Sequence, residues 1–168
     1  TITHYTGNLS NAAIALGRGE LSTFIKIFSI IIIFFTGSTL SGFLFYGQKL
    51  SIKKYYSILP ILFGIVIIIT YNVTNNKNVI LGLFALGMGA QNGTWLKVRG
   101  VQVRTTHITG YLTDAAFSLG AVLHGYKEEA WKVKFYLLSS MFFLAGGAIS
   151  TVIIKMLGFQ TVIVLATF

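Results

Sequence analysis

Long runs of apolar residues constrain this chain more than any other feature. A helix that crosses a lipid bilayer needs about 20 mainly apolar residues, and residues 21–46 meet this requirement with a centre made almost entirely of Ile and Phe. Further spans are predicted at residues 55–71, 79–96 and 131–156, and a last one begins within residues 159–168. Hydrocarbon rather than water is therefore expected around most of the polypeptide.

Composition supports a lipid environment. Hydrophobic residues make up 54% of the chain and charged residues 10%, whereas soluble proteins carry roughly 25% charged residues. The net charge of +9 comes from 13 Lys and Arg against 4 Asp and Glu. These basic residues lie in short gaps between apolar runs rather than on one wettable face, which excludes a nucleic-acid partner. The absence of cysteine excludes disulfides and thiolate metal sites.

The same gaps predict an orientation. Cytoplasmic loops of membrane proteins carry an excess of Lys and Arg, which places the loops 48–54 and 97–104 in the cytoplasm and the polar turn 72–78 on the opposite side. The chain starts inside a motif at Thr1 and stops inside an apolar run at Phe168. We therefore expect it to be the covered part of a longer protein.

A polar segment near the N-terminus occurs a second time. Residues 3–13 match residues 106–116 at an offset of 103 (107 − 4), so that His4 aligns with His107. Further along, residues 37–41 resemble residues 146–150 at an offset of 109. Apolar composition would match Leu to Ile but not His to His. An internal repeat is therefore predicted, with a short insertion between the two matching blocks.

The predicted fold class is all-α: a polytopic transmembrane helix bundle built from two pseudo-symmetric repeats. It forms a single membrane domain, 1–168, with repeat one at 1–78, its first helix missing before Thr1, and repeat two at 79–168, truncated at the C-terminus. Residues 3–16 and 106–123 are rich in small and polar residues, as in broken or re-entrant helices. If they do not cross the membrane the repeats are inverted, which we favour; if they cross, the repeats are parallel.

Two polar faces recur in these segments. On a helix, His107, Tyr111 and Asp114 share one face, as do His4, Asn8 and Asn11. A carboxylate within an apolar segment usually marks an ion or proton path, and a His–Asp pair could relay protons. The alternatives are that Asp114 is wetted or bonded to Thr113, and that these side chains bond one another between helices.

The Thr-Gly pairs suggest a second kind of site. Thr6 and Thr109 suit the N-cap position, and two helix N-termini starting there could bind an anionic solute. Packing of helices through small residues is the alternative for Gly7 and Gly110. Packing is the expected role of the other conspicuous glycines, Gly37, Gly42, Gly89, Gly93, Gly146 and Gly147. The amides of Gln91 and Asn92 fit either a substrate or the neighbouring repeat.

The candidate residues of a substrate or ion pathway are His4, Thr6, Gly7, Asn8, Asn11, Gln91, Asn92, His107, Thr109, Gly110, Tyr111 and Asp114. No catalytic residue, metal site or cofactor is predicted. His4, His107 and His124 lack the spacing and the carboxylate cluster of a metal site, and no Ser or Thr has a base beside it.

Three of these motifs together resemble the DUF1275 family, also called the YoaK-like or UPF0700 proteins. The motifs are Gly-Ala-Gln-Asn-Gly at 89–93, Thr-Thr-His-Ile-Thr-Gly at 105–110 and Thr-Gly-Asn-Leu at 6–9. The resemblance runs from residue 3 to about residue 157 and implies a bacterial inner-membrane protein with six spans. The chain lacks the family's opening helix, and Tyr111 stands where repeat one has Asn8.

The leading functional hypothesis is a small-solute or ion transporter, rather than an enzyme. The two Thr-Gly segments would meet near the midplane, with Asp114 and His107 as coupling groups. The alternative is a non-catalytic membrane subunit or scaffold that binds partner helices, and a weaker one is an intramembrane enzyme acting on lipid. The expected partners are the lipid bilayer, an unidentified small molecule or ion, and a second copy or a partner membrane subunit.

Overall fold

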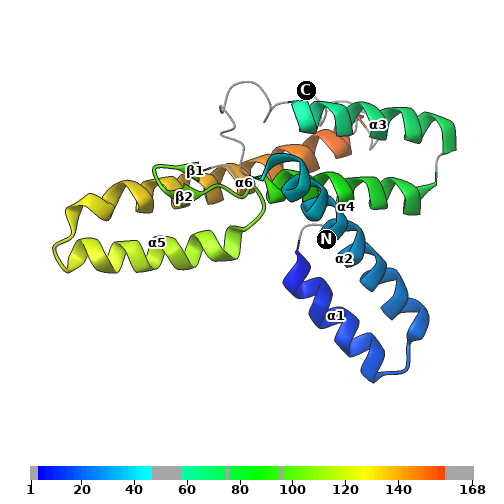
Figure 1. Ribbon diagram of the computed structural model, residues 1–168, viewed down its shortest axis with the longest axis horizontal. Helices are drawn as coiled ribbons and strands as arrows, with labels where there is room; N and C mark the ends of the chain where they lie inside the picture. Colours follow the sequence, from blue (N-terminus) through cyan, green and yellow to red (C-terminus); the bar gives the residue numbers. More distant parts are fainter. Residues whose placement is uncertain (1–3, 47–57, 75, 95–96, 158–168) are drawn as a thin grey trace. The chain divides into compact units, whose positions relative to one another are not determined.

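The computed structural model describes residues 4–46, 58–74, 76–94 and 97–157, which form two compact units. Unit 1 holds the helices α1 to α4 and a β-hairpin, and unit 2, which begins at Thr105, holds α5, a 3₁₀ turn and α6 (Figure 1). The described chain is almost entirely helical, which confirms the predicted all-α class.

Unit 1 is organised around its longest helix. The short helix α1 (Tyr5–Gly17) and α2 (Leu21–Phe45) form an antiparallel hairpin (Figure 1). Helix α4 (Lys77–Gly93) packs against α2 and also against α3 (Ile58–Thr74), where Ile67 and Ile80 form a small core. Pro60 is the third residue of α3, where its missing N–H costs no hydrogen bond, as expected.

Helices α2 and α4 approach each other closely because both present small residues. A Cβ atom at Gly37 would collide with the Leu86 carbonyl oxygen, and one at Gly89 with that of Phe34. A Cβ at Gly93 would lie 2.9 Å from the Ser38 Cα. These contacts confirm the predicted packing role of three glycines. Gly42 is different, since among the described residues no atom of another element lies within 4 Å of its Cβ position.

A two-stranded β-hairpin follows α4, where the sequence predicted only a loop. Strands β1 (Lys97–Val98) and β2 (Val101–Gln102) are antiparallel, with Val98 opposite Val101. The two turn residues between them have positive φ, 48° and 84°, the geometry of a tight hairpin turn. The valines of Val-Arg-Gly-Val-Gln-Val, at residues 98–103, favour short strands. The basic residues of this segment led instead to the prediction of a cytoplasmic loop.

Unit 2 is a second helical hairpin. Helix α5 (Ile108–Leu123) is followed by the 3₁₀ turn η1 (Lys127–Glu129) and then by α6 (Ala130–Leu157), which packs along α5 (Figure 1). The side chains of α5 that face α6 are Tyr111, Ala115 and Ser118. From residue 141 to residue 156, all but one of the α6 residues are exposed within the described chain.

The predicted spans agree with the helices to within a few residues. Two helical segments, Leu21–Phe45 and Lys127–Met156, are long and apolar enough to cross a membrane. Helices α3 and α4 have 17 residues each, the lower limit for a crossing helix. The spans predicted at 55–71 and 79–96 lie partly, and the one beginning within 159–168 wholly, outside the described residues.

Candidate functional site

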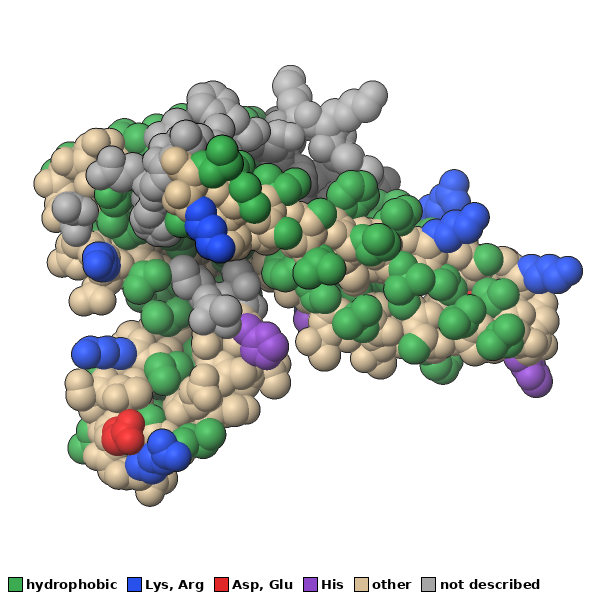
Figure 2. Space-filling model, turned by 180° about the vertical axis from the view of Figure 1, so that it is seen from behind, with side chains coloured by type: hydrophobic (Ala, Val, Ile, Leu, Met, Phe, Trp, Pro, Cys, Tyr) green, Lys and Arg blue, Asp and Glu red, His purple; other side chains and the backbone are tan. Residues whose placement is uncertain are grey.

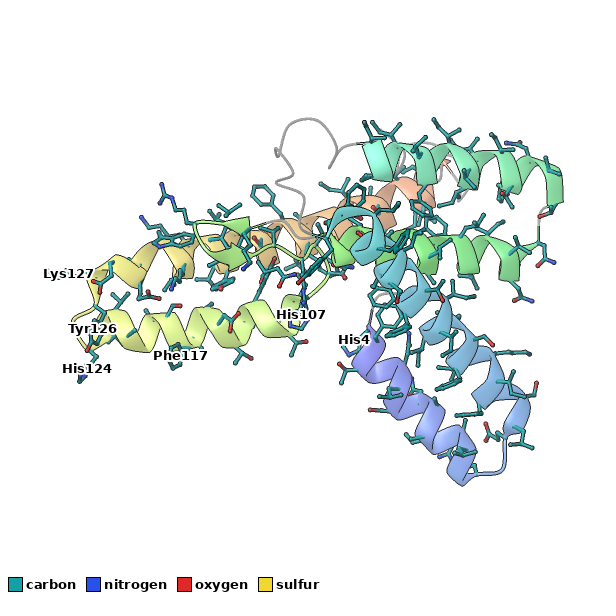
Figure 3. The ribbon with its side chains drawn as sticks, viewed as in Figure 1. His4, His107, Phe117, His124, Tyr126 and Lys127 are labelled. Carbon is teal, nitrogen blue, oxygen red and sulfur yellow. The ribbon has the colours of Figure 1, made fainter. Side chains whose placement is uncertain are left out.

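The two repeated segments begin their helices in the same way. The N-cap residues are His4 for α1 and His107 for α5, with φ/ψ of −95°/69° and −89°/55° (Figure 3). Each imidazole lies over the glycine at the third helical position, so a Cβ at Gly7 or at Gly110 would collide with the ring. The glycine therefore leaves room for the imidazole of its own N-cap residue.

Thr6 and Thr109 are not the N-caps that the sequence predicted. Each is the second residue of its helix, and neither N-cap side chain, His4 or His107, forms a capping hydrogen bond. The carbonyls of these threonines accept hydrogen bonds of 3.1 Å from Ser10 Oγ and Thr113 Oγ1. The Ser10 and Thr113 hydroxyls therefore bond to the backbone of their own helices.

The two short helices also turn equivalent faces to their long partners. The buried residues of α1 are Ala12 and Ala15. At the offset of 103 they correspond to Ala115 and Ser118, which are buried in α5. Matching side chains therefore occupy matching packing positions, beyond the similarity of sequence.

Both short helices end in the same C-terminal motif. The Glu20 N–H donates to the Ala15 carbonyl over 2.9 Å, and the Tyr126 N–H to the Ala121 carbonyl over 3.0 Å. The residue before each donor is a glycine with positive φ, 73° at Gly19 and 116° at Gly125. This is the Schellman motif, which satisfies the last carbonyls of a helix.

The change of offset has a structural explanation. The C-terminal glycines are separated by 106 residues (125 − 19), because α5 has 16 residues and α1 has 13. The starts of the long helices are separated by 109 (130 − 21), because η1 adds three residues before α6. The three extra residues of α5 and the three of η1 together equal the difference between the two offsets of the predicted repeat, 103 and 109.

The short helices are too short to cross a bilayer on their own. At about 1.5 Å per residue, 13 and 16 residues give roughly 20 Å for α1 and 24 Å for α5, against a hydrocarbon core of about 30 Å. If the polar turn of each hairpin lies at one membrane surface, the N-terminus of each short helix lies within the hydrocarbon, several ångströms short of the other surface. These N-termini are at His4 and His107.

Asp114 has a neighbour that the sequence did not reveal. Its carboxylate lies close enough to Tyr136 of α6 to act on that side chain electrostatically. It is not bonded to Thr113, whose hydroxyl donates to the Thr109 carbonyl. The described residues show no hydrogen bond or ion pair between His107 and Asp114. The predicted His–Asp pair is therefore not formed.

Tyr136 is fixed by aromatic packing. It is 6% exposed, and its ring centroid lies 5.2 Å from that of Tyr111, which is 4% exposed. Phe135 contacts both rings, at 6.0 Å from Tyr111 and 5.5 Å from Tyr136. Asp114 itself is exposed. One face of the α5–α6 hairpin thus carries a carboxylate held at the rim of a buried aromatic cluster.

Unit 1 lacks this ionisable group. Asn11 stands at the position of Asp114 and Asn8 at that of Tyr111, while Ile27 aligns with Tyr136 at the offset of 109. Asn8 is half-buried and Asn11 exposed. In unit 1 the aromatic contact at the start of α1 is instead that of Tyr5 with Phe34, at 3.8 Å.

The Asn92 amide at the end of α4 bonds to its own helix. Asn92 Nδ2 donates to the Met88 carbonyl over 2.9 Å, and Thr94 Oγ1 donates to the main-chain carbonyl of Gln91 over 2.7 Å. Ser38 Oγ of α2 donates to the Gly89 carbonyl over 2.9 Å. Gln91 and Asn92 are half-buried, so the Asn92 side chain combines a structural role with partial access.

Outside the aromatic cluster the α5–α6 hairpin is apolar along its flank and basic at its turn (Figure 2). Phe117 and Leu123 are 79% and 80% exposed. At the turn, His124 stacks on Tyr126, and Lys132 pairs with Glu129 over 2.7 Å (Figure 3). Apolar flanks ending in aromatic and basic residues are typical of a hairpin that meets a membrane surface.

Comparison with known proteins identifies a family. Neither the curated proteins nor the solved structures contain a match. A family profile described as "Protein of unknown function (DUF1275)" matches residues 1–168. Since the match covers the whole chain, this helical membrane protein belongs to the DUF1275 family.

Proposed function

We propose that the protein is a small-solute or ion carrier, a multi-pass protein of the inner (plasma) membrane, in which Asp114 binds the coupling ion. The observation that carries this proposal is the Asp114 carboxylate on a hairpin with apolar flanks, near the buried aromatic pair of Tyr111 and Tyr136. A carboxylate in such surroundings is expensive in a bilayer and is commonly retained for ion movement.

The short helices support a carrier. A helix that ends inside the hydrocarbon presents free N–H groups and the positive end of its dipole to whatever enters there. The His4 and His107 ends suit this role, since neither N-cap imidazole forms a capping hydrogen bond with its helix. The matching caps, packing faces and C-terminal motifs support an internal duplication, which is common among transporters.

In this proposal the two hairpins have different roles, because only one of them carries a carboxylate at the matched position. With Asp114 in unit 2 and Asn11 in unit 1, the coupling ion binds to unit 2. The uncharged amides of unit 1, Asn8 and Asn11, line the pathway of the solute. Asn can bind a polar solute but cannot exchange a proton, which is the basis of this division.

The test is coupled transport in proteoliposomes that contain a pH-sensitive dye. An inward proton gradient is imposed, and small anionic, cationic and neutral solutes are added one at a time. We expect one class of solute to accelerate acidification with the wild-type protein, and Asp114→Asn to abolish that acceleration. The control is Glu128→Gln, which removes an exposed carboxylate from the turn of the same hairpin and should leave the rate unchanged.

Two results would count against this proposal. Wild-type rates in the Asp114→Asn protein would remove Asp114 from the mechanism. Failure of every solute class to alter acidification with the wild-type protein would contradict a coupled carrier.

The second candidate, a scaffold for partner helices, is supported by a feature of α6. Within the described residues, no atom of another element lies within 4 Å of the Cβ positions of Gly146 and Gly147. Small residues of this kind allow close helix association in membranes, although the sequence predicted a packing partner that the described chain does not supply. A stoichiometric partner that remains bound during purification in mild detergent would favour the scaffold over the carrier.

A further inference from the structure

We infer that the β1–β2 hairpin binds the phosphate group of an anionic phospholipid, with the Arg99 guanidinium at its tip as the main contact. The inference concerns the membrane surface and is independent of the proposed transport role of Asp114. It is carried by the backbone of the turn, by the exposed basic side chains around it and by its distance along the chain from the end of α4.

The turn of the hairpin has an arginine at a position that disfavours it. Arg99 has a φ of 48°, and among the described residues it is the only one other than glycine with a positive φ. Residues other than Gly, Asn and Asp rarely adopt this conformation, and two-residue hairpin turns prefer Asn-Gly or Asp-Gly. Gly100, at 84°, follows this preference, and Arg99 does not. Strained residues cluster at ligand-binding sites, so the guanidinium is the group whose role needs an explanation.

The two strands give the hairpin a polar face and an apolar face. Lys97 is paired with Gln102, and Val98 with Val101. Since side chains alternate along a strand, the two valines share one face, and Lys97 and Gln102 share the other. Both valines are half-buried, whereas Lys97 and Arg99 are exposed. The hairpin therefore holds its basic side chains on the outside of unit 1.

Positive charge gathers around the turn without an acidic residue nearby in the sequence. Lys97, Arg99 and Arg104 are all exposed, and no Asp or Glu occurs between residues 77 and 113. Each Lys or Arg close to a membrane surface adds to the attraction for anionic headgroups. The charge of the hairpin is thus complementary to an anionic lipid.

The position of the hairpin along the chain brings it to the headgroup layer. Helix α4 is capped at Thr94, and β1 begins three residues later (97 − 94). Three residues extend over at most about 10 Å, and the headgroup layer on each side of a bilayer is roughly 5–8 Å thick. If α4 crosses the bilayer, as its apolar sequence predicts, β1 begins within reach of the lipid phosphates.

The residue at the tip distinguishes a phosphate site from charge that only orients the chain. The positive-inside effect needs positive charge in a loop, and Lys supplies it as well as Arg in any backbone conformation. Phosphate recognition makes use of the planar guanidinium, which can form two parallel hydrogen bonds with phosphate oxygens. An arginine in a strained turn is explained by the second requirement and not by the first.

Lipid-dependent unfolding of the purified protein tests the inference. The protein is unfolded by heat in a nonionic detergent that contains phosphatidylglycerol or phosphatidylcholine with the same acyl chains, and bound lipids are counted by native mass spectrometry. We expect phosphatidylglycerol to raise the Tm of the wild type more than phosphatidylcholine does. In Arg99→Asn this extra rise should shrink, and the affinity for phosphatidylglycerol should fall roughly fivefold, the factor for one basic residue near an anionic surface.

The same substitution should have the opposite effect when anionic lipid is left out. Asn is favoured over Arg at a turn position with positive φ, so Arg99→Asn relieves the strain. Its Tm in detergent alone should rise by about 1–3 °C. A gain in stability without lipid, together with a weaker response to lipid, would separate loss of binding from damage to the fold.

Two further variants test the choice of residue. Arg99→Lys keeps the charge but loses the paired donors, so its response to phosphatidylglycerol should be weaker than that of the wild type. Lys77→Gln removes an exposed charge at the other end of α4, and it should leave the response unchanged. Added salt should reduce the response of the wild type, because it screens the attraction between exposed charges.

Three outcomes would overturn the inference. An unchanged response in Arg99→Asn would remove the tip of the hairpin from lipid binding. A wild-type response in Arg99→Lys would show that charge alone matters, as it does for orientation in the membrane. Equal stabilisation of the wild type by inorganic phosphate or by a polyglutamate peptide would assign the hairpin to a soluble anion or to an acidic protein.

Discussion

At the scale of single residues, glycines in the same helix have different tasks. Gly37 lets the backbone of α4 approach α2, whereas in the described part of the chain no other element lies within 4 Å of the Cβ position of Gly42. The sequence predicted packing for both, because small residues in apolar helices look alike. Only the register between two helices decides which glycine meets a backbone atom, and that register depends on the whole contact.

The first prediction follows from this difference. Gly37→Ala places a methyl group against the Leu86 carbonyl, which cannot move without shifting α4. Overpacking of this kind costs about 1–3 kcal/mol, offset in part by the higher helix propensity of Ala. In thermal unfolding followed in detergent, Tm should fall by roughly 2–10 °C. Gly42→Ala is the control, and an equal fall in both variants would show that helix distortion rather than contact is responsible.

The surroundings of Asp114 show the same limit of prediction from sequence. The carboxylate could be singled out because charge is rare in apolar segments. The aromatic cluster near it could not, since Tyr136 lies on the next helix and nothing in its local sequence marks it. The helix caps were also assigned to the wrong residue, since the frequent preference for Thr is outweighed here by a His that folds over a glycine.

At the scale of elements, each hairpin joins a short helix to a long one. The lengths of α2 and α6, 25 and 28 residues, follow from their apolar runs and were predicted well. The short helices were also predicted as distinct, because their polar residues interrupt the apolar pattern. Their common caps could be anticipated only through the match of His4 to His107, since no local propensity favours His at an N-cap.

The depth of the short helices can be measured with single cysteines, because the chain has none of its own. If the start of α5 lies inside the hydrocarbon, Thr109→Cys should react with a small thiol reagent and resist a bulky, impermeant maleimide. Lys127→Cys, at the exposed turn of the same hairpin, should react readily with both. Equal reactivity of the two cysteines toward the impermeant maleimide would show that α5 reaches both surfaces.

At the scale of the whole molecule, the surrounding lipid determines the fold class more than any specific contact does. Many large apolar side chains remain exposed, among them Phe43 at 85% and Phe142 at 74%. In water such a surface would aggregate, whereas in lipid it costs nothing. This is why fold class could be derived from composition and run length. Helix pairing could not, because lipid-facing and helix-facing residues are equally apolar and only small residues distinguish them.

The distribution of basic residues predicts how unit 1 is oriented in the membrane. Lys97, Arg99 and Arg104 follow α4, while Asn76 and Asn78 lie at its start with Lys77 as the basic residue there. The excess of positive charge should hold the end of α4 in the cytoplasm.

A reporter that is active only outside the cytoplasm should be active when fused after residue 76 and inactive after residue 104. A fluorescent protein that folds only in the cytoplasm should give the reverse pattern. Activity of one reporter at both positions would mean that α4, at 17 residues, does not cross the bilayer, and the expected number of spans would fall accordingly.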